Sequence, residues 1–184
     1  MKVIFLDIDG VMNTDFSESY VKADNGWTYI GIDNSKVKEL KRIVDTTGAE
    51  IVLSSDWRYA FEVGAYKQEV HTCKYLNNKL RKQGLKIYDK TPDIAKFERG
   101  LEISTWLDKH PEVTDYVILD DHSFAITGKY YEVDEKLRSH FILTTGKVAD
   151  GGLTPEVADI AIEILNGERV GPVSWWKLRE KNEA

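Results

Sequence analysis

The first twelve residues, MKVIFLDIDGVM, contain an apolar run that ends in two aspartates separated by one residue. Residues 3–6 form the continuous apolar segment that is typical of a strand covered on both faces in a parallel sheet. Ligands bind to such sheets beyond the carboxyl ends of the strands. Asp7 and Asp9 share side-chain parity, so both can face one pocket there, and Gly10 permits a tight turn. The segment therefore predicts a site that holds two carboxylates close together.

Two carboxylates at this spacing repel each other unless a cation or a proton lies between them. A hard divalent ion resolves the repulsion, and Mg²⁺ fits oxygen ligands best. The alternative interpretation is that Asp-x-Asp-Gly is only a polar turn after a strand, because Asp and Gly are common turn residues.

A second apolar run, residues 51–53, ends in hydroxyl side chains. Ser54 and Ser55 fall at the carboxyl end of this expected strand, where a hydroxyl and a backbone N–H can hold a phosphate oxygen. Arg58 adds a planar donor fork that suits phosphate. The same segment also fits a Ser-Asp helix cap followed by a surface arginine.

A third run, residues 116–119, ends in the adjacent carboxylates Asp120 and Asp121. Two like charges side by side at a strand end are unfavourable unless a cation or hydrogen-bond donors compensate them. This pair therefore predicts metal-site residues, and a solvated acidic turn is the alternative.

A cationic residue precedes the amphipathic stretch 101–107, whose apolar residues recur at helical spacing. Arg99 thus lies near a helix start, where a positive charge is disfavoured by the helix dipole unless an anion is bound there. Lys96 is the alternate candidate for the same role, and a solvated surface arginine is the third interpretation.

The order of these four segments resembles the haloacid dehalogenase (HAD) superfamily of phosphohydrolases, over roughly residues 1–165. More narrowly, the chain is similar to the phosphatase domains of RNA-repair proteins and to the phosphatase half of polynucleotide kinase/phosphatase. The segments that carry this similarity are FLDIDGVMN, VLSSDWR, ERGLEISTWL, YVILDD and GGLT.

The resemblance implies a role for each matching residue. Asp7 would be the nucleophile that forms an aspartyl-phosphate, and Asp9 would be the general acid and then the base. Ser54 would hold a phosphoryl oxygen, and Arg99 would take the place that a lysine usually holds. Apart from the resemblance, the residue patterns above predict substrate contacts for Ser55 and Arg58, with Lys96 as the alternate to Arg99.

The resemblance also implies a Mg²⁺ site. The ion would be ligated by the Asp7 side chain, the Asp9 backbone carbonyl and Asp121. Asp120 would support the ion directly or through another ligand.

The remaining sequence alternates between helical and strand patterns, which predicts an α/β fold with a doubly wound, Rossmann-like, mostly parallel sheet. One domain is expected over residues 1–166, followed by a C-terminal extension, 167–184, that contains Trp175 and Trp176. The further expected elements are a helix from Asn34 or Ser35 to Gly48, a helical region within 60–83, strands at 85–88 and 141–145, and a helix at 154–165.

The connecting segments indicate an open site. Neither residues 10–33 nor residues 59–95 leave room for a large cap domain. The resemblance implies that superfamily members without a cap act on macromolecular ends or phosphoproteins, because their site is open. Trp27, Tyr29 and Trp57 could stack on a base near the opening, or they could be packing residues.

Composition favours a single soluble enzyme domain, with 42% hydrophobic and 30% charged residues among 184. No apolar stretch approaches the roughly 20 residues needed to span a bilayer, and the N-terminal run, which Asp7 and Asp9 interrupt, is not expected to be a signal peptide. Cys73 is the one cysteine, which excludes an internal disulfide and suits a cytoplasmic location. The histidines show no ligand spacing; they are His71, His110, His122 and His140.

The net charge of −6 means that no global basic field recruits nucleic acid, which argues against a passive nucleic-acid binding module. The predicted function is a magnesium-dependent phosphomonoesterase that acts on RNA or DNA ends, with 3′-phosphates favoured. The alternatives are a phosphatase of mononucleotides or other small esters, and a catalytically silent HAD-like binding domain. No membrane association is expected, and no obligate protein partner is evident.

Overall fold

The computed structural model describes residues 1–94, 98–124 and 135–174. The strands are β1 (Lys2–Leu6), β2 (Tyr20–Lys22), β3 (Thr28–Ile30), β4 (Glu50–Leu53), β5 (Ile87–Lys90), β6 (Asp115–Asp120), β7 (Phe141–Leu143) and β8 (Val173–Ser174). The helices are α1 (Asn34–Thr47), the 3₁₀ helix η1 (Asp56–Ala60), α2 (His71–Arg81), α3 (Arg99–Asp108), α5 (Glu135–Ser139) and α6 (Pro155–Leu165). Among the described residues, no helix has the length and apolar character needed to cross a membrane.

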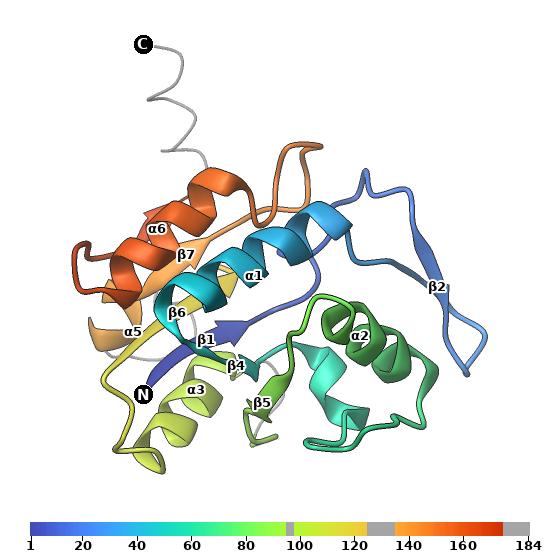
Figure 1. Ribbon diagram of the computed structural model, residues 1–184, viewed down its shortest axis with the longest axis horizontal. Helices are drawn as coiled ribbons and strands as arrows, with labels where there is room; N and C mark the ends of the chain where they lie inside the picture. The colour runs from blue at the N-terminus through green and yellow to red at the C-terminus, as the bar shows by residue number, and fades with distance from the viewer. Residues whose placement is uncertain (95–97, 125–134, 175–184) are drawn as a thin grey trace.

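The centre of the molecule is a six-stranded sheet with the strand order β5-β4-β1-β6-β7-β8 (Figure 1). Every neighbouring pair in this sheet is parallel. Strands β2 and β3 form a separate antiparallel hairpin. The expected α/β fold with a doubly wound, mostly parallel sheet is confirmed.

Alternating side chains of the central strands pack on opposite faces of the sheet. Ile4 and Leu6 of β1 belong to a core that α1, α2 and α6 cover, whereas Val3 and Phe5 belong to a second core beneath α3. Figure 1 shows α1 and α6 side by side across one face. Since both faces are covered, the strands need no polar alternation, which explains the continuous apolar run of β1.

The register of the three central strands aligns their carboxyl ends. Leu6 pairs with Leu53 of β4 and with Leu119 of β6. The alignment continues one residue further, because the Asp7 N–H donates to the Leu119 carbonyl and the Ser54 N–H donates to the Leu6 carbonyl, each at 3.0 Å. The polar residues that follow the three strands therefore meet at one edge of the sheet.

Several short elements were not predicted from the sequence. Strands β2, β3 and β8 have two or three residues each, which is too short to produce a recognisable period. Strand β8 pairs with β7, so the sheet continues beyond the domain boundary expected at residue 166. Trp175 and Trp176 lie outside the described residues.

The segment between β1 and α1 forms the small β2–β3 hairpin and no cap domain. The side chain of Asn13 donates to the Ile30 carbonyl at 3.1 Å and so ties the end of the hairpin to the turn after β1. The expected absence of a large cap over this end of the sheet is therefore confirmed for the described residues.

Candidate active site

Three of the predicted carboxylates converge at the carboxyl edge of the sheet. Asp7, Asp120 and Asp121 each offer an oxygen atom, and these oxygens lie within 4.8 Å of one another. Gly10 makes this approach possible, because it has φ 73° and a Cβ atom there would collide with the Asp121 carboxylate. Gly10 of the DIDG motif is thus needed both for the turn and for the close approach of Asp121.

The carboxylates of this cluster destabilise one another's charge. Burial and then Asp120 raise the pKa of Asp7 to about 7, and burial and then Asp7 raise the pKa of Asp121 to about 6. Burial also raises the pKa of Asp120. A cation at this position would relieve the repulsion, and a set of carboxylate oxygens is the donor set that Mg²⁺ prefers. The residues therefore fit a hard divalent ion.

Arg99 provides a cation on the helix side of the cluster. It lies in the first turn of α3, and its Nη1 is 3.0 Å from Asp7 Oδ2 and 2.6 Å from Asp120 Oδ2. Burial lowers the pKa of this guanidinium, but the two carboxylates outweigh burial and raise it. Arg99 is therefore placed where it can neutralise an anion that reaches Asp7. Lys96, the alternate candidate, lies outside the described residues.

Asp9 lies at the exposed mouth of the site, and both of its oxygens accept hydrogen bonds. Oδ1 accepts from Asn13 Nδ2 at 3.0 Å, and Oδ2 accepts from the indole nitrogen of Trp57 at 3.1 Å. Asn13 Oδ1 also accepts from the Gly10 N–H at 3.0 Å. Neither partner was predicted from the sequence, although the position of Asn13 four residues after Asp9 is a local signal. The contacts fix the orientation of the Asp9 carboxylate.

The two serines after β4 have different environments. A hydrogen bond from the Ser55 side chain lowers the pKa of Asp7, and Ser55 also caps η1 by accepting from the Trp57 N–H at 3.4 Å. The Ser54 side chain is fully buried, and its hydroxyl has no hydrogen-bond partner among the described residues. Ser55 is therefore the serine in contact with Asp7, whereas the resemblance assigned the phosphoryl contact to Ser54.

Arg58 is buried, whereas the alternative interpretation of this segment placed it on the surface. It is 3% exposed, its Nη2 is 2.6 Å from Glu102 Oε2, and its Nη1 donates to the Ser54 carbonyl at 2.9 Å. Both terminal nitrogens of the fork are thus engaged within the protein, and the predicted substrate contact of Arg58 stays a prediction. Arg58 links the loop after β4 to α3.

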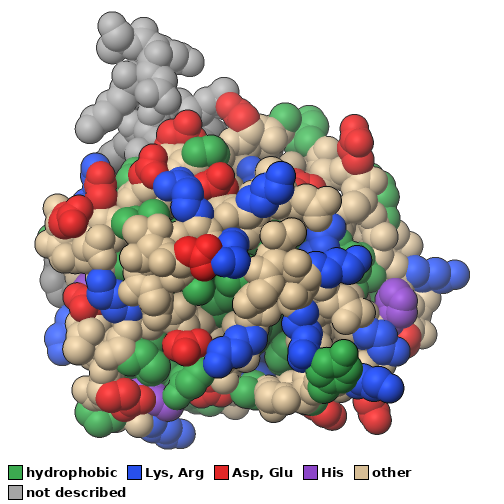
Figure 2. Space-filling view, in the orientation of Figure 1, with side chains coloured by type: hydrophobic (Ala, Val, Ile, Leu, Met, Phe, Trp, Pro, Cys, Tyr) green, Lys and Arg blue, Asp and Glu red, His purple; other side chains and the backbone are tan. Residues whose placement is uncertain are grey.

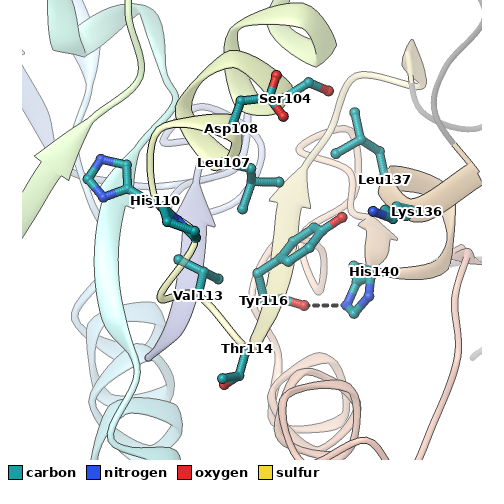
Figure 3. A pocket seen from close by; sticks show the side chains of 11 residues that line it. Ser104, Leu107, Asp108, His110, Val113, Thr114, Tyr116, Lys136, Leu137 and His140 are labelled. Carbon is teal, nitrogen blue, oxygen red and sulfur yellow. Dashed lines mark hydrogen bonds between the residues drawn. The ribbon is translucent and has the colours of Figure 1, made fainter.

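A pocket at the opposite end of β6 contains two of the histidines (Figure 3). The His140 ring stacks on Tyr116 with 4.1 Å between centroids, and its Nδ1 is 2.6 Å from the Tyr116 carbonyl oxygen. The His110 ring stacks on Trp106 with 3.7 Å between centroids. These histidines have packing roles at the amino end of β6, whereas the carboxylate cluster lies at its carboxyl end.

Comparison with protein families identifies the kind of domain to which this site belongs. The family described as the HAD domain in Swiss Army Knife RNA repair proteins matches residues 3–158. The match spans every residue of the carboxylate cluster together with Arg99. Comparison with curated proteins and with solved structures gives no match.

Proposed function

Because this chain belongs to the HAD domains of Swiss Army Knife RNA repair proteins, we propose that it is a magnesium-dependent phosphomonoesterase acting on terminal phosphates of nucleic acid. The observation that carries the proposal is the convergence of the Asp7, Asp120 and Asp121 carboxylates with Arg99 at the carboxyl edge of the sheet. Family membership supports a phosphatase-type hydrolase in RNA repair. We further propose that 3′-phosphates are preferred to 5′-phosphates.

In the proposed reaction, a carboxylate oxygen of Asp7 attacks phosphorus while the bond from phosphorus to the ester oxygen breaks. Asp9 donates its proton to the departing oxygen. Water then attacks the phosphorus of the aspartyl-phosphate, Asp9 takes the proton from that water, and inorganic phosphate leaves with the Asp7 carboxylate regenerated. Division into two displacements replaces one difficult step by two easier ones.

Charge neutralisation is the main demand that a transferring phosphoryl group makes on a site. Arg99 can meet part of this demand, because it already contacts Asp7. Mg²⁺ would be held by the side chains of Asp7 and Asp121 and by the Asp9 carbonyl, with Asp120 in support. When bound, the ion neutralises charge on the phosphoryl oxygens.

The direct test is a phosphatase screen with Mg²⁺ present. The substrates are oligonucleotides with a 3′- or a 5′-phosphate, free mononucleotides and p-nitrophenyl phosphate. We expect hydrolysis of the terminal phosphate of the oligonucleotides, with the 3′-phosphate preferred, and reversible loss of activity in excess EDTA. Full activity in EDTA would contradict the metal requirement. Mononucleotides that match or exceed oligonucleotides in kcat/KM would limit the proposal to small esters.

A second prediction concerns Asp9 as the proton donor. Asp9→Asn should reduce kcat strongly for alkyl phosphates, by about 10²–10⁴-fold, because an alcohol departs poorly without a proton. The loss should be much smaller with p-nitrophenyl phosphate, whose leaving group needs little protonation. Steady-state kinetics on both substrates measure the ratio. Equal losses on the two substrates would rule out the general-acid role.

A further inference from the structure

The outer face of α2 and the loop before it carry a local excess of positive charge. Residues 66–88 contain six of the chain's 25 lysines and arginines, but only one of its 31 acidic residues, Glu69. Figure 2 shows Lys and Arg side chains gathered around a hydrophobic side chain over the region of α2. This concentration is unexpected in a chain whose net charge is −6.

The charges lie on one face of the helix. Lys74, Asn78, Arg81 and Lys82 are exposed and follow helical spacing, and Lys67 joins them from the preceding loop. All of these residues line one surface pocket. The α2 patch is defined here as Tyr66, Lys67, Lys74, Asn78, Arg81 and Lys82.

The cations of the α2 patch have no acidic partner in the part of the chain that the structure describes. Lys67, Lys74, Arg81 and Lys82 form no ion pair with a carboxylate of residues 1–94, 98–124 or 135–174. By contrast, several cations elsewhere do pair with acids, as Arg42 does with Asp159. An unpaired row of this kind attracts a polyanion.

The α2 patch also presents an aromatic ring. Tyr66 is 71% exposed, and the Arg81 guanidinium lies 4.2 Å from the centroid of its ring. A tyrosine paired with an arginine beside open solvent is a suitable surface for stacking of a nucleobase. The patch thus combines the two elements that single-strand binding requires, a row of cations and a stacking surface.

Buried amides hold the loop of the α2 patch in place. Gln68 is 1% exposed, accepts from the Glu62 N–H at 2.7 Å and donates to the Glu62 carbonyl at 2.6 Å. Asn77 on α2 donates to the Tyr66 carbonyl at 3.1 Å. Tyr66 and Lys67 are therefore fixed against the helix, so the binding surface exists before a ligand arrives.

Helix α2, which carries the patch, packs against two elements close to the candidate active site. Helix α2 contacts both η1 and β2 (Figure 1). Trp57 of η1 donates to Asp9, and the tip of the hairpin holds the start of α2 through the hydrogen bond from the His71 N–H to Asp24 at 3.0 Å. A strand that ends at Asp7 can therefore continue over η1 or the hairpin towards α2.

We propose that the α2 patch binds the sugar-phosphate backbone of a single strand of nucleic acid whose end occupies the Asp7 site. This inference rests on the proposed function, which it extends from the terminal phosphate to the adjoining nucleotides. Lys74, Arg81 and Lys82 contact phosphates, and Tyr66 stacks on a base. The patch supplies the local attraction that the acidic chain as a whole lacks.

Binding of a fluorescent single-stranded RNA about ten nucleotides long and without a terminal phosphate tests the proposal, with anisotropy as the readout. The variant Arg81→Gln/Lys82→Gln should bind more weakly, and its slope of log K against log salt should be smaller in magnitude by about 1.4, because each lost phosphate contact contributes about 0.7. Tyr66→Leu should weaken binding about tenfold. These side chains are exposed, so the variants should fold normally.

The matched control is Lys38→Gln/Lys109→Gln, which removes the same charge from exposed positions on α1 and at the end of α3. Equal affinities and equal salt slopes for the two double variants would overturn the proposal. Binding to vesicles of anionic lipid, without binding to RNA, would also overturn it.

The outcome does not depend on catalysis, because the RNA probe carries no terminal phosphate. Loss of binding only in the α2 patch variants supports the proposal even if the wild-type protein hydrolyses no phosphate ester, in which case only the proposed function fails. Conversely, if the terminal phosphate of an oligonucleotide is hydrolysed and the patch variants bind RNA like the control, the proposed function stands and the inference falls.

Discussion

Replacement of Asp7 by asparagine should reduce phosphatase turnover to background, a loss on the order of 10⁴-fold or more. The amide cannot attack phosphorus, and it also removes one carboxylate from the cluster with Asp120 and Asp121. Initial rates with p-nitrophenyl phosphate and excess Mg²⁺ measure the effect. Robust hydrolysis by the variant would remove Asp7 from the role of nucleophile.

Thermal unfolding of the Asp7→Asn variant tests whether its loss of activity reflects a loss of folding. Burial and Asp120 raise the pKa of Asp7 to about 7 in the folded protein, whereas an unfolded chain has an aspartate pKa of about 3.9. Between these values the folded state keeps a proton that the unfolded state has released, so the metal-free wild-type protein loses stability as the pH rises through this window. The asparagine variant should show a weaker pH dependence, and near pH 8 its Tm without metal should equal or exceed that of the wild type.

The second large effect is expected at the buried ion pair between Arg58 and Glu102. The two side chains are 3% and 2% exposed. Glu102→Gln should lower the free energy of unfolding by about 3–5 kcal/mol, because it removes the buried counter-charge of Arg58 and leaves the guanidinium with the exposed Asp56, 3.5 Å away. Urea unfolding followed by circular dichroism measures this difference. Equal slopes of the unfolding free energy against urea concentration would show that both proteins expose similar surface on unfolding.

Two further variants distinguish the effect of leaving a buried charge unpaired from the effect of removing any charge. Arg58→Met/Glu102→Leu removes both charges and should recover much of the lost stability, because apolar residues often replace a buried ion pair at little cost. Asp159→Asn breaks an exposed pair with Arg42 and should change stability by less than about 1 kcal/mol. If Glu102→Gln behaves like Asp159→Asn, the pair does not have the structural role described here.

This ion pair also has a consequence for the candidate active site. Arg58 donates to the Ser54 carbonyl, next to the serine that contacts Asp7, and Glu102 lies one helical turn after Arg99. The pair therefore connects the loop of Ser55 with the helix of Arg99. Its loss should disturb the placement of both groups relative to Asp7.

The sequence was sufficient to predict a mostly parallel α/β sheet with carboxylates at the carboxyl ends of two of its strands. A strand buried on both faces must be apolar throughout, so the run before Asp7 and the runs before Ser54 and Asp120 are visible without any tertiary information. In a parallel sheet all carboxyl ends lie at one edge, so residues that follow these runs are expected to meet there. The convergence of Asp7, Asp120 and Asp121 agrees with this reasoning.

The tertiary structure decided which side chains pair with one another. In the sequence, Arg58 cannot be distinguished from an arginine that binds phosphate. Only the packing of α3 brings Glu102, 44 residues away in sequence, to the Arg58 guanidinium. Trp57 reaches Asp9 across 48 residues in the same way. Likewise, the lysines of α2 can be counted in the sequence, but the α2 patch exists because Gln68 and Asn77 dock a loop on the helix. Local patterns encode strands and helices, because their periods depend on neighbouring residues, whereas contacts between distant side chains arise only when the elements pack.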